Sequence, residues 1–154
     1  MMQKWKRNTN FLGFTLIELL LVISIIAILG VVVASVGLRF TASNNLENKV
    51  NEIISSLRTA QINAMIGKED SNWGVIVSGD EIVLFAGNSF SDLGRDTAYD
   101  QSFSIPGSIS ISSFEVVFTK PGGTPSSTQV ISISSEVGES ATVSVNEVGI
   151  INLD

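Results

Sequence analysis

The chain has 154 residues with no cysteine and no histidine, which excludes disulfides, thiolate or imidazole metal sites, and catalysis that depends on either side chain. Its net charge of −6 is unevenly distributed, because residues 1–13 carry three basic residues and no acid. Residues 39–154 carry six basic and fourteen acidic residues, a net charge of −8 that makes nucleic acid an unfavourable partner.

Residues 14–38 form an apolar run in which Glu18 is the only ionisable side chain. As a helix, the run is roughly 37 Å long, and the hydrocarbon core of a bilayer is about 30 Å thick, so the sequence predicts a single transmembrane helix. The run is too long for a cleaved secretory signal. Basic residues Lys4, Lys6 and Arg7 precede it and predict a cytoplasmic N-terminus, with the rest of the chain in the periplasm or outside the cell.

The junction between these two segments reads Gly13-Phe14-Thr15-Leu16-Ile17-Glu18. A carboxylate inside an apolar membrane segment costs on the order of 2.5–3.5 kcal/mol on insertion scales, so Glu18 is expected to have a function. A short basic leader followed by this run resembles the prepilin signature of type IV pilins and type II secretion pseudopilins. The alternative is an ordinary signal anchor that contains a glutamate by chance.

The resemblance implies a role for three residues. Gly13 matches the residue before the bond that a prepilin peptidase cleaves, and Phe14 would become the new, N-methylated N-terminus. Glu18 matches the family's acidic residue, which meets the N-terminal amine of a neighbouring subunit during assembly. An amine and a carboxylate, each costly in lipid, become tolerable when they pair between subunits.

The same resemblance implies four regions and a set of partners. Residues 1–13 would be the cleaved leader, 14–38 the transmembrane and filament-core helix, 39–67 its amphipathic continuation, and 68–154 an antiparallel β domain. The partners would be prepilin peptidase, other pilin or pseudopilin subunits, an inner-membrane assembly platform with its ATPase, and the membrane before assembly. No catalytic residue, cofactor or metal is implied, and the function is structural.

Beyond residue 38 the helix is expected to become amphipathic and to end near Gly67-Lys68. Its apolar stripe, which should pack on a sheet, consists of Leu46, Val50, Ile53, Ile54, Leu57, Ala60 and Ala64. Ile62 and Ile66 fall outside the stripe. A broad sheet that wraps the end of the helix is the favoured explanation for them, and contact with a neighbouring subunit is the other.

The remaining sequence predicts antiparallel strands, so the expected fold class is α+β, a pilin-like fold with a long N-terminal helix packed on a small β domain of two sheets. Gly79-Asp80 predicts a hairpin between residues 73–78 and 81–86. Serine at alternating positions in the later strands predicts a solvated sheet face. The other expected strands are 102–105, 108–112, 114–120, 128–135, 141–146 and 148–153.

The β region has a second, weaker resemblance. Four stretches are similar to H-type minor pseudopilins and their type IV pilus relatives (GspH/FimT-like): Trp73-Gly74-Val75, Leu84-Phe85-Ala86-Gly87, Val116-Val117-Phe118 and the final Asn146-Glu147-Val148-Gly149-Ile150-Ile151. Many type IV pilins close a C-terminal loop with a disulfide, which this chain cannot form. The resemblance therefore favours a minor subunit of a secretion pseudopilus over a major pilin.

The sequence also bears on a metal site, on catalysis and on two other functions. Asp92, Asp96 and Asp100 in the polar loop 87–101 could chelate calcium, although their spacing is not that of an EF-hand and a solvated acidic loop is the default. Without histidine no Ser-His-Asp arrangement is possible, so the chain is not expected to be an enzyme. Two alternative functions are a minor pilin that binds DNA in natural transformation and a membrane-anchored ligand-binding module that never assembles.

Overall fold

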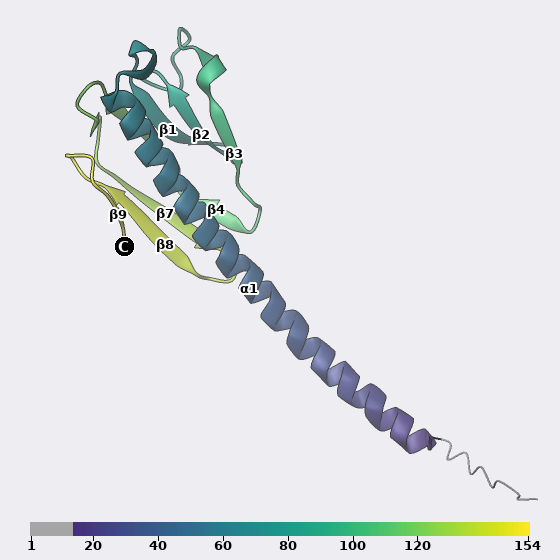
Figure 1. The fold of residues 1–154 in the computed structure, drawn as a ribbon. Helices are drawn as coiled ribbons and strands as arrows, with labels where there is room; N and C mark the ends of the chain where they lie inside the picture. Colours follow the sequence, from purple (N-terminus) through teal and green to yellow (C-terminus); the bar gives the residue numbers. More distant parts are fainter. Residues whose placement is uncertain (1–13) are drawn as a thin grey trace, which may run out of the picture. The chain divides into compact units, whose positions relative to one another are not determined.

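The computed structural model describes residues 14–154, without the side chains of residues 32–40 (Figure 1). The predicted leader 1–13, including Gly13, lies outside the described residues. Two compact units divide the chain, Met1–Leu38 (unit 1) and Arg39–Asp154 (unit 2), and each is described by itself. Helix α1 spans Leu16–Met65 and contributes residues to both.

In unit 1 the helix begins directly after Thr15, which acts as its N-terminal cap. The Glu18 amide donates hydrogen bonds to the Thr15 hydroxyl (3.3 Å) and to the Thr15 carbonyl (3.1 Å). A Thr cap satisfies an amide that the first turn would otherwise leave without a partner. All side chains of residues 14–31 are exposed, so this part of the helix has no core of its own.

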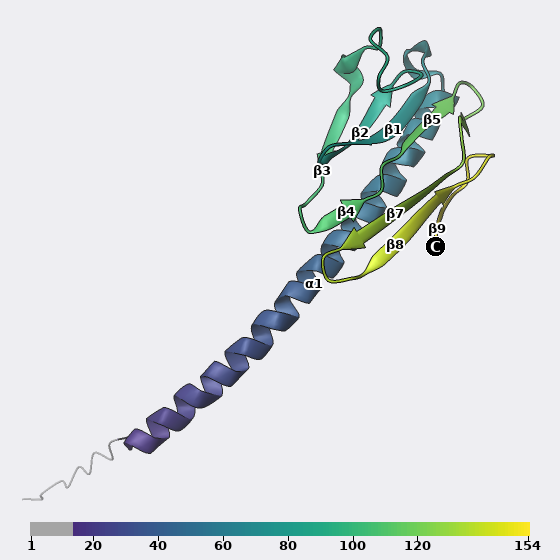
Figure 2. The same cartoon turned by 180° about the vertical axis from the view of Figure 1, so that it is seen from behind.

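Unit 2 contains nine strands in two antiparallel sheets, which confirms the predicted α+β class with a long N-terminal helix and two sheets. The helix lies along one side of both sheets, in front of them in Figure 1 and behind them in Figure 2. One sheet has the order β3-β2-β1-β5-β6 and the other β4-β7-β8-β9. Their bounds are β1 Trp73–Ser78, β2 Glu81–Ala86, β3 Gln101–Ser104, β4 Ile109–Ile111, β5 Glu115–Thr119, β6 Thr124–Pro125, β7 Gln129–Ser135, β8 Ser140–Val145 and β9 Ile151–Leu153.

The core of unit 2 forms where the amphipathic part of α1 meets the inner faces of both sheets. Ile53, Leu57, Ala60 and Ala64 are completely buried in it, and Ile54 packs against it, as the stripe predicted. The two alanines present little side chain at the contact. The sheets contribute alternate residues, among them Trp73, Val75, Ile82, Leu84, Val116, Phe118, Ile131, Ile133, Val143 and Val145.

The hairpin of β1 and β2 has the predicted bounds, with Ser78 opposite Glu81. Serine also indicates solvent correctly at Ser132 and Ser134 of β7, which are exposed and alternate with the buried Ile131 and Ile133, whereas Ser135 at the end of the strand is buried. The turn after β5 differs from the prediction, because Thr124–Pro125 adds a short strand where the sequence predicted only a loop.

The prediction that a broad sheet wraps the end of α1 is wrong. Ile62 is 57% exposed and Ile66 is 68% exposed, because the sheets cover only the side of the helix that carries the stripe. These two isoleucines therefore lie on the surface of unit 2.

Candidate functional site

The N-terminal end of the described chain holds two of the three residues that the sequence singled out. Phe14 is 85% exposed immediately before the helix, and Glu18 lies in the first turn. Gly13 lies outside the described residues. A carboxylate in the first turn of a helix interacts favourably with the positive end of the helix dipole, so Glu18 does not oppose the local structure.

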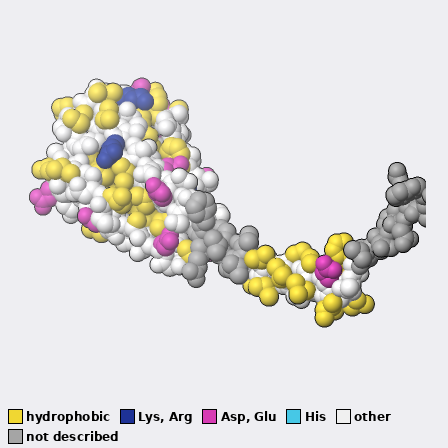
Figure 3. Space-filling model, turned by 60° about the horizontal axis from the view of Figure 1, so that its bottom comes forward, with side chains coloured by type: hydrophobic (Ala, Val, Ile, Leu, Met, Phe, Trp, Pro, Cys, Tyr) yellow, Lys and Arg dark blue, Asp and Glu magenta, His cyan; other side chains and the backbone are white. Residues whose placement is uncertain are grey.

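An apolar surface surrounds this carboxylate. Large hydrophobic side chains between Phe14 and Val31 are all exposed, and Figure 3 shows them crowded along the visible side of the segment. Scattered exposed hydrophobic residues are ordinary, but a contiguous surface of this kind marks an interaction with a partner or a membrane. The Ser24 hydroxyl donates a hydrogen bond to the Leu20 carbonyl within the same helix, at 2.8 Å.

Within the part of the chain whose residues are described, no helix is both long and apolar enough to cross a membrane. The predicted span over residues 14–38 includes positions 32–38, whose side chains lie outside the described residues.

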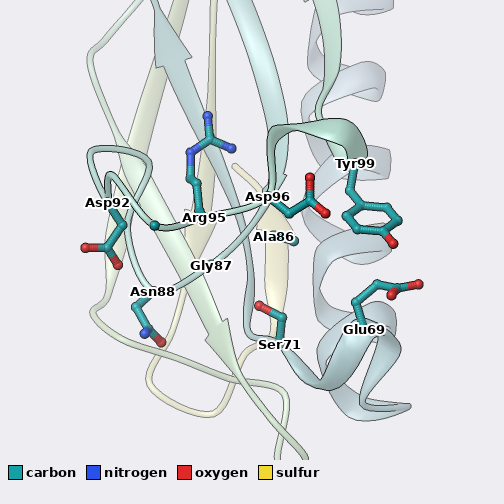
Figure 4. A pocket seen from close by; sticks show the side chains of 10 residues that line it. Glu69, Ser71, Ala86, Gly87, Asn88, Asp92, Arg95, Asp96 and Tyr99 are labelled. Carbon is teal, nitrogen blue, oxygen red and sulfur yellow. The ribbon is translucent and has the colours of Figure 1, made fainter.

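Unit 2 has a pocket of about 560 Å³ between the end of α1 and the loop after β2 (Figure 4). It is lined by Glu69 and Ser71, by residues 86–88, and in the loop by Asp92, Gly94, Arg95, Asp96 and Tyr99. In Figure 4, Glu69, Asp96 and Tyr99 lie together on one side, and Asp92 lies on the other.

Two of the three aspartates considered for calcium have other roles. Asp100 forms a two-pronged ion pair with Arg95 at 2.5 and 2.8 Å. Asp96 accepts a hydrogen bond from the Ala98 amide at 2.9 Å and caps the short 3₁₀ helix η2, Thr97–Tyr99. Among the described residues, no group of three or more His, Cys, Asp or Glu is placed to hold a metal ion.

Arg95 organises this loop, a role that the sequence did not predict. Its guanidinium lies 4.4 Å from the ring centre of Phe90 and 5.6 Å from that of Phe85. Its Nε donates to the Phe90 carbonyl at 3.0 Å, and the Phe90 amide donates to Glu115 on β5 at 2.8 Å. The loop 87–100 is therefore fastened over the outer face of the first sheet and is not a free acidic loop.

Gly74 makes room for a second layer on the outer face of the first sheet, formed by the Phe85 ring and the loop 87–100. A Cβ at position 74 would lie 2.6 Å from the Cζ atom of Phe85, which faces it across the β1–β2 pair, and 2.8 Å from the Val116 carbonyl oxygen. Only a residue without a side chain allows the Phe85 ring to approach β1 this closely. The pairing of a strand glycine with a cross-strand aromatic was the signal in the sequence that could have revealed the layer.

Two ionisable groups at the end of α1 have shifted pKa values. A hydrogen bond to the Glu69 carboxylate, together with its negative charge, raises the pKa of Tyr99. A hydrogen bond and the positive charge of Lys120 lower the pKa of Asp70. Both groups are surface groups, and the arrangement joins the segment after α1 to the loop and to β5 without forming a catalytic pair.

Comparison with known families identifies the N-terminal segment. Residues 8–34 match the prokaryotic N-terminal methylation motif. No curated protein and no solved structure matches the chain. The motif is a type IV pilin-like prepilin signature, so it supports the pilin and pseudopilin family. It also supports processing by prepilin peptidase and assembly with other pilin subunits. It indicates a structural subunit and not an enzyme family. The similarity to H-type pseudopilins stays a prediction.

Proposed function

We propose that this chain is a structural subunit of a pilus-like filament, made as an inner-membrane precursor with a cytoplasmic leader and assembled through its N-terminal helix. The observation that carries the proposal is the methylation motif at residues 8–34, joined to a helical segment whose apolar side chains are all exposed over residues 14–31. Cleavage after Gly13 would free the amine of Phe14, which would then be methylated.

Glu18 supplies the polar contact in this proposal. It lies in the first helical turn among exposed apolar side chains, and no ion pair within the described residues involves it. A carboxylate in such surroundings gains most from a cationic partner, and the N-terminal amine of a neighbouring subunit is one. The apolar helices would form the centre of the fibre, and unit 2 would face outward.

We further propose a secretion pseudopilus as the fibre, with this chain as a low-abundance subunit. The similarity of the β region to H-type pseudopilins and the absence of cysteine support it. The number of copies of this chain per purified fibre, measured by quantitative mass spectrometry against the other subunits, tests this part separately.

The test of the main proposal is the N-terminus of the mature protein. Mass spectrometry of membranes should find a chain that begins at a methylated Phe14, and Gly13→Val should leave the precursor uncleaved because the peptidase needs a small residue beside the bond. Gly30→Val is the matched control, because it makes the same substitution at a position where an added Cβ meets no atom within 4 Å. A mature N-terminus at any other residue would refute the proposal.

A further inference from the structure

We propose that unit 2 carries its own head-to-tail contact between copies, in which a row of side chains along the C-terminal end of α1 and the residue after it in one copy receives the β7–β8 turn of the next. The row consists of Arg58, Ile62 and Ile66. The turn consists of residues 136–139. This inference rests on the proposed function, since it concerns how neighbouring copies touch within a fibre.

Arg58 differs from the other described basic residues of unit 2 in its lack of a partner. Lys49 pairs with Glu52, Arg95 with Asp100 and Lys120 with Asp70, and Lys68 lies over the Trp73 ring. Among the basic side chains described in this unit, only Arg58 has no acidic or aromatic partner. Its neighbours three and four positions away on the helix include no acid, so α1 cannot neutralise it locally.

Two exposed isoleucines extend the row from this cation. Ile62 and Ile66 follow Arg58 at successive four-residue steps, which places the three side chains on one side of the helix. The Ile66 amide still donates to the Ile62 carbonyl at 2.9 Å, so the helical geometry continues to the end of the row. A partner for this row needs negative charge and a small apolar group close together.

The turn between β7 and β8 has that chemistry. Glu136 and Glu139 are exposed on either side of Val137, which is itself 42% exposed. Neither carboxylate takes part in an ion pair within the described residues. The turn is held in shape by hydrogen bonds from the Ser135 amide to the Glu139 carbonyl (2.8 Å) and from the Gly138 amide to the Ser135 carbonyl (3.0 Å).

The row and the turn lie at opposite ends of unit 2. The Glu136 amide donates to the Ser108 carbonyl, and Asn45 donates to the Ser108 hydroxyl, so the turn lies beside position 45 of the helix. Position 62 is roughly 25 Å further along α1 at about 1.5 Å per residue. Figures 1 and 2 both show the β7–β8 turn at the end of unit 2 where the helix enters it.

The position of the β7–β8 turn at the opposite end from the row distinguishes it from other acidic turns of unit 2. Exposed apolar residues also lie beside exposed acids at Asp92-Leu93 and at Glu147-Val148. Gln61 donates to the Gly149 carbonyl, and Tyr99 contacts Glu69, so both of these turns lie at the same end as the row. A contact between opposite ends uses two different surfaces and repeats without closing, which is what parallel copies in a fibre require.

The size of the contact explains why it would act only within a fibre. A row of three side chains is far smaller than the roughly 800 Å² that each partner buries in a stable interface. It would contribute only after the N-terminal helices have brought two copies together and raised their effective concentration. The fibre would then contain short runs of this chain in direct succession, while the chain stays a low-abundance subunit of the fibre as a whole.

Disulfide crosslinking in the full-length protein tests the contact, because the chain has no cysteine of its own. A chain with both Ile62→Cys and Val137→Cys should give a ladder of linked multimers when oxidised in assembled fibres. Either substitution alone should give no ladder. The matched control pairs Ile62→Cys with Leu93→Cys, which combines the row with a turn at its own end and should also give none.

Charge reversal separates an ionic contact from mere proximity. Arg58→Glu in the two-cysteine chain should lower the ladder yield several-fold, and adding Glu136→Arg with Glu139→Arg should restore it. Fibres without a ladder would overturn the inference and leave the proposed function intact, whereas absence of fibres would count against the function itself. A ladder from the Leu93→Cys pair, or a dimer through Cys at position 62 alone, would also overturn it.

Discussion

The two parts of helix α1 use apolar residues in opposite ways. Residues 14–31 leave every large apolar side chain exposed, whereas residues 46–64 carry all but Ile62 in one stripe that packs against the two sheets. The same secondary structure therefore carries an exposed apolar surface in unit 1 and part of an internal core in unit 2. The difference shows that helix formation does not determine burial, and that the distribution of side chains around the helix does.

Among changes to the two parts of α1, we expect the largest effect from removing the charge of Glu18. It is the one ionisable residue in unit 1 whose side chain is described. Glu18→Leu should be cleaved and remain in the membrane, because the cost of a carboxylate in lipid is gone, but it should enter fibres poorly. Glu18→Gln keeps the shape without the charge and should behave in the same way, while Glu18→Asp should be intermediate. The measurement is the fraction of each variant in sheared fibres.

Membrane abundance of each variant is the control for this experiment. Should Glu18→Leu assemble as well as the unaltered chain, pairing between amine and carboxylate is not what recruits the subunit, and contacts of unit 2 would have to do so.

The second prediction concerns the buried stripe. A chain truncated to residues 39–154 should fold and remain monomeric, since its core is internal to unit 2. In that chain Leu57→Ala should lower the free energy of unfolding by about 2–5 kcal/mol, because a fully buried leucine leaves a cavity. Ile62→Ala on the same helix, at an exposed position, should change it by less than about 1 kcal/mol.

Urea denaturation followed by circular dichroism measures both substitutions. Equal effects at positions 57 and 62 would show that the helix does not distinguish an inner from an outer side in solution. An unfolded truncated chain would show that unit 2 needs unit 1 for its stability.

The smallest expected effect is a pH dependence at the end of α1. The pKa of Tyr99 is raised, so the protonated phenol is favoured in the folded state. Its contribution to stability is present below the pKa of an unfolded tyrosine and is lost as the pH rises through the higher folded value. Glu69→Gln should lower the pKa of Tyr99 toward its ordinary value.

Ultraviolet absorbance reads this titration directly, because Tyr99 is the only tyrosine in the chain. Asp96→Asn is a useful comparison, since Asp96 contributes less than Glu69 and its loss should shift the curve less. An unchanged titration in Glu69→Gln would show that the loop and the segment after α1 are not in contact in solution.

Patterns within short stretches of sequence predicted much of this protein. Three of these patterns depend only on residues close together in the chain, so they can be interpreted without a structure. They are the prepilin-like run at residues 13–18, the stripe at positions 46–64 and the hairpin around Gly79-Asp80. The end of α1 was also predicted, since Gly67 adopts the left-handed conformation (φ 64°) that commonly ends helices.

Only the tertiary structure showed what lies over the outer face of the first sheet and beside the end of α1. Arg95, Phe85 and Glu115 come from a loop and two separate strands, and no periodicity in the sequence predicts that they lie close together. The exposure of Ile62 and Ile66 likewise depends on how far the sheets extend around the helix, which is a property of their packing. Local sequence determines which elements form, but contacts between distant residues decide which of their faces remain available to a partner.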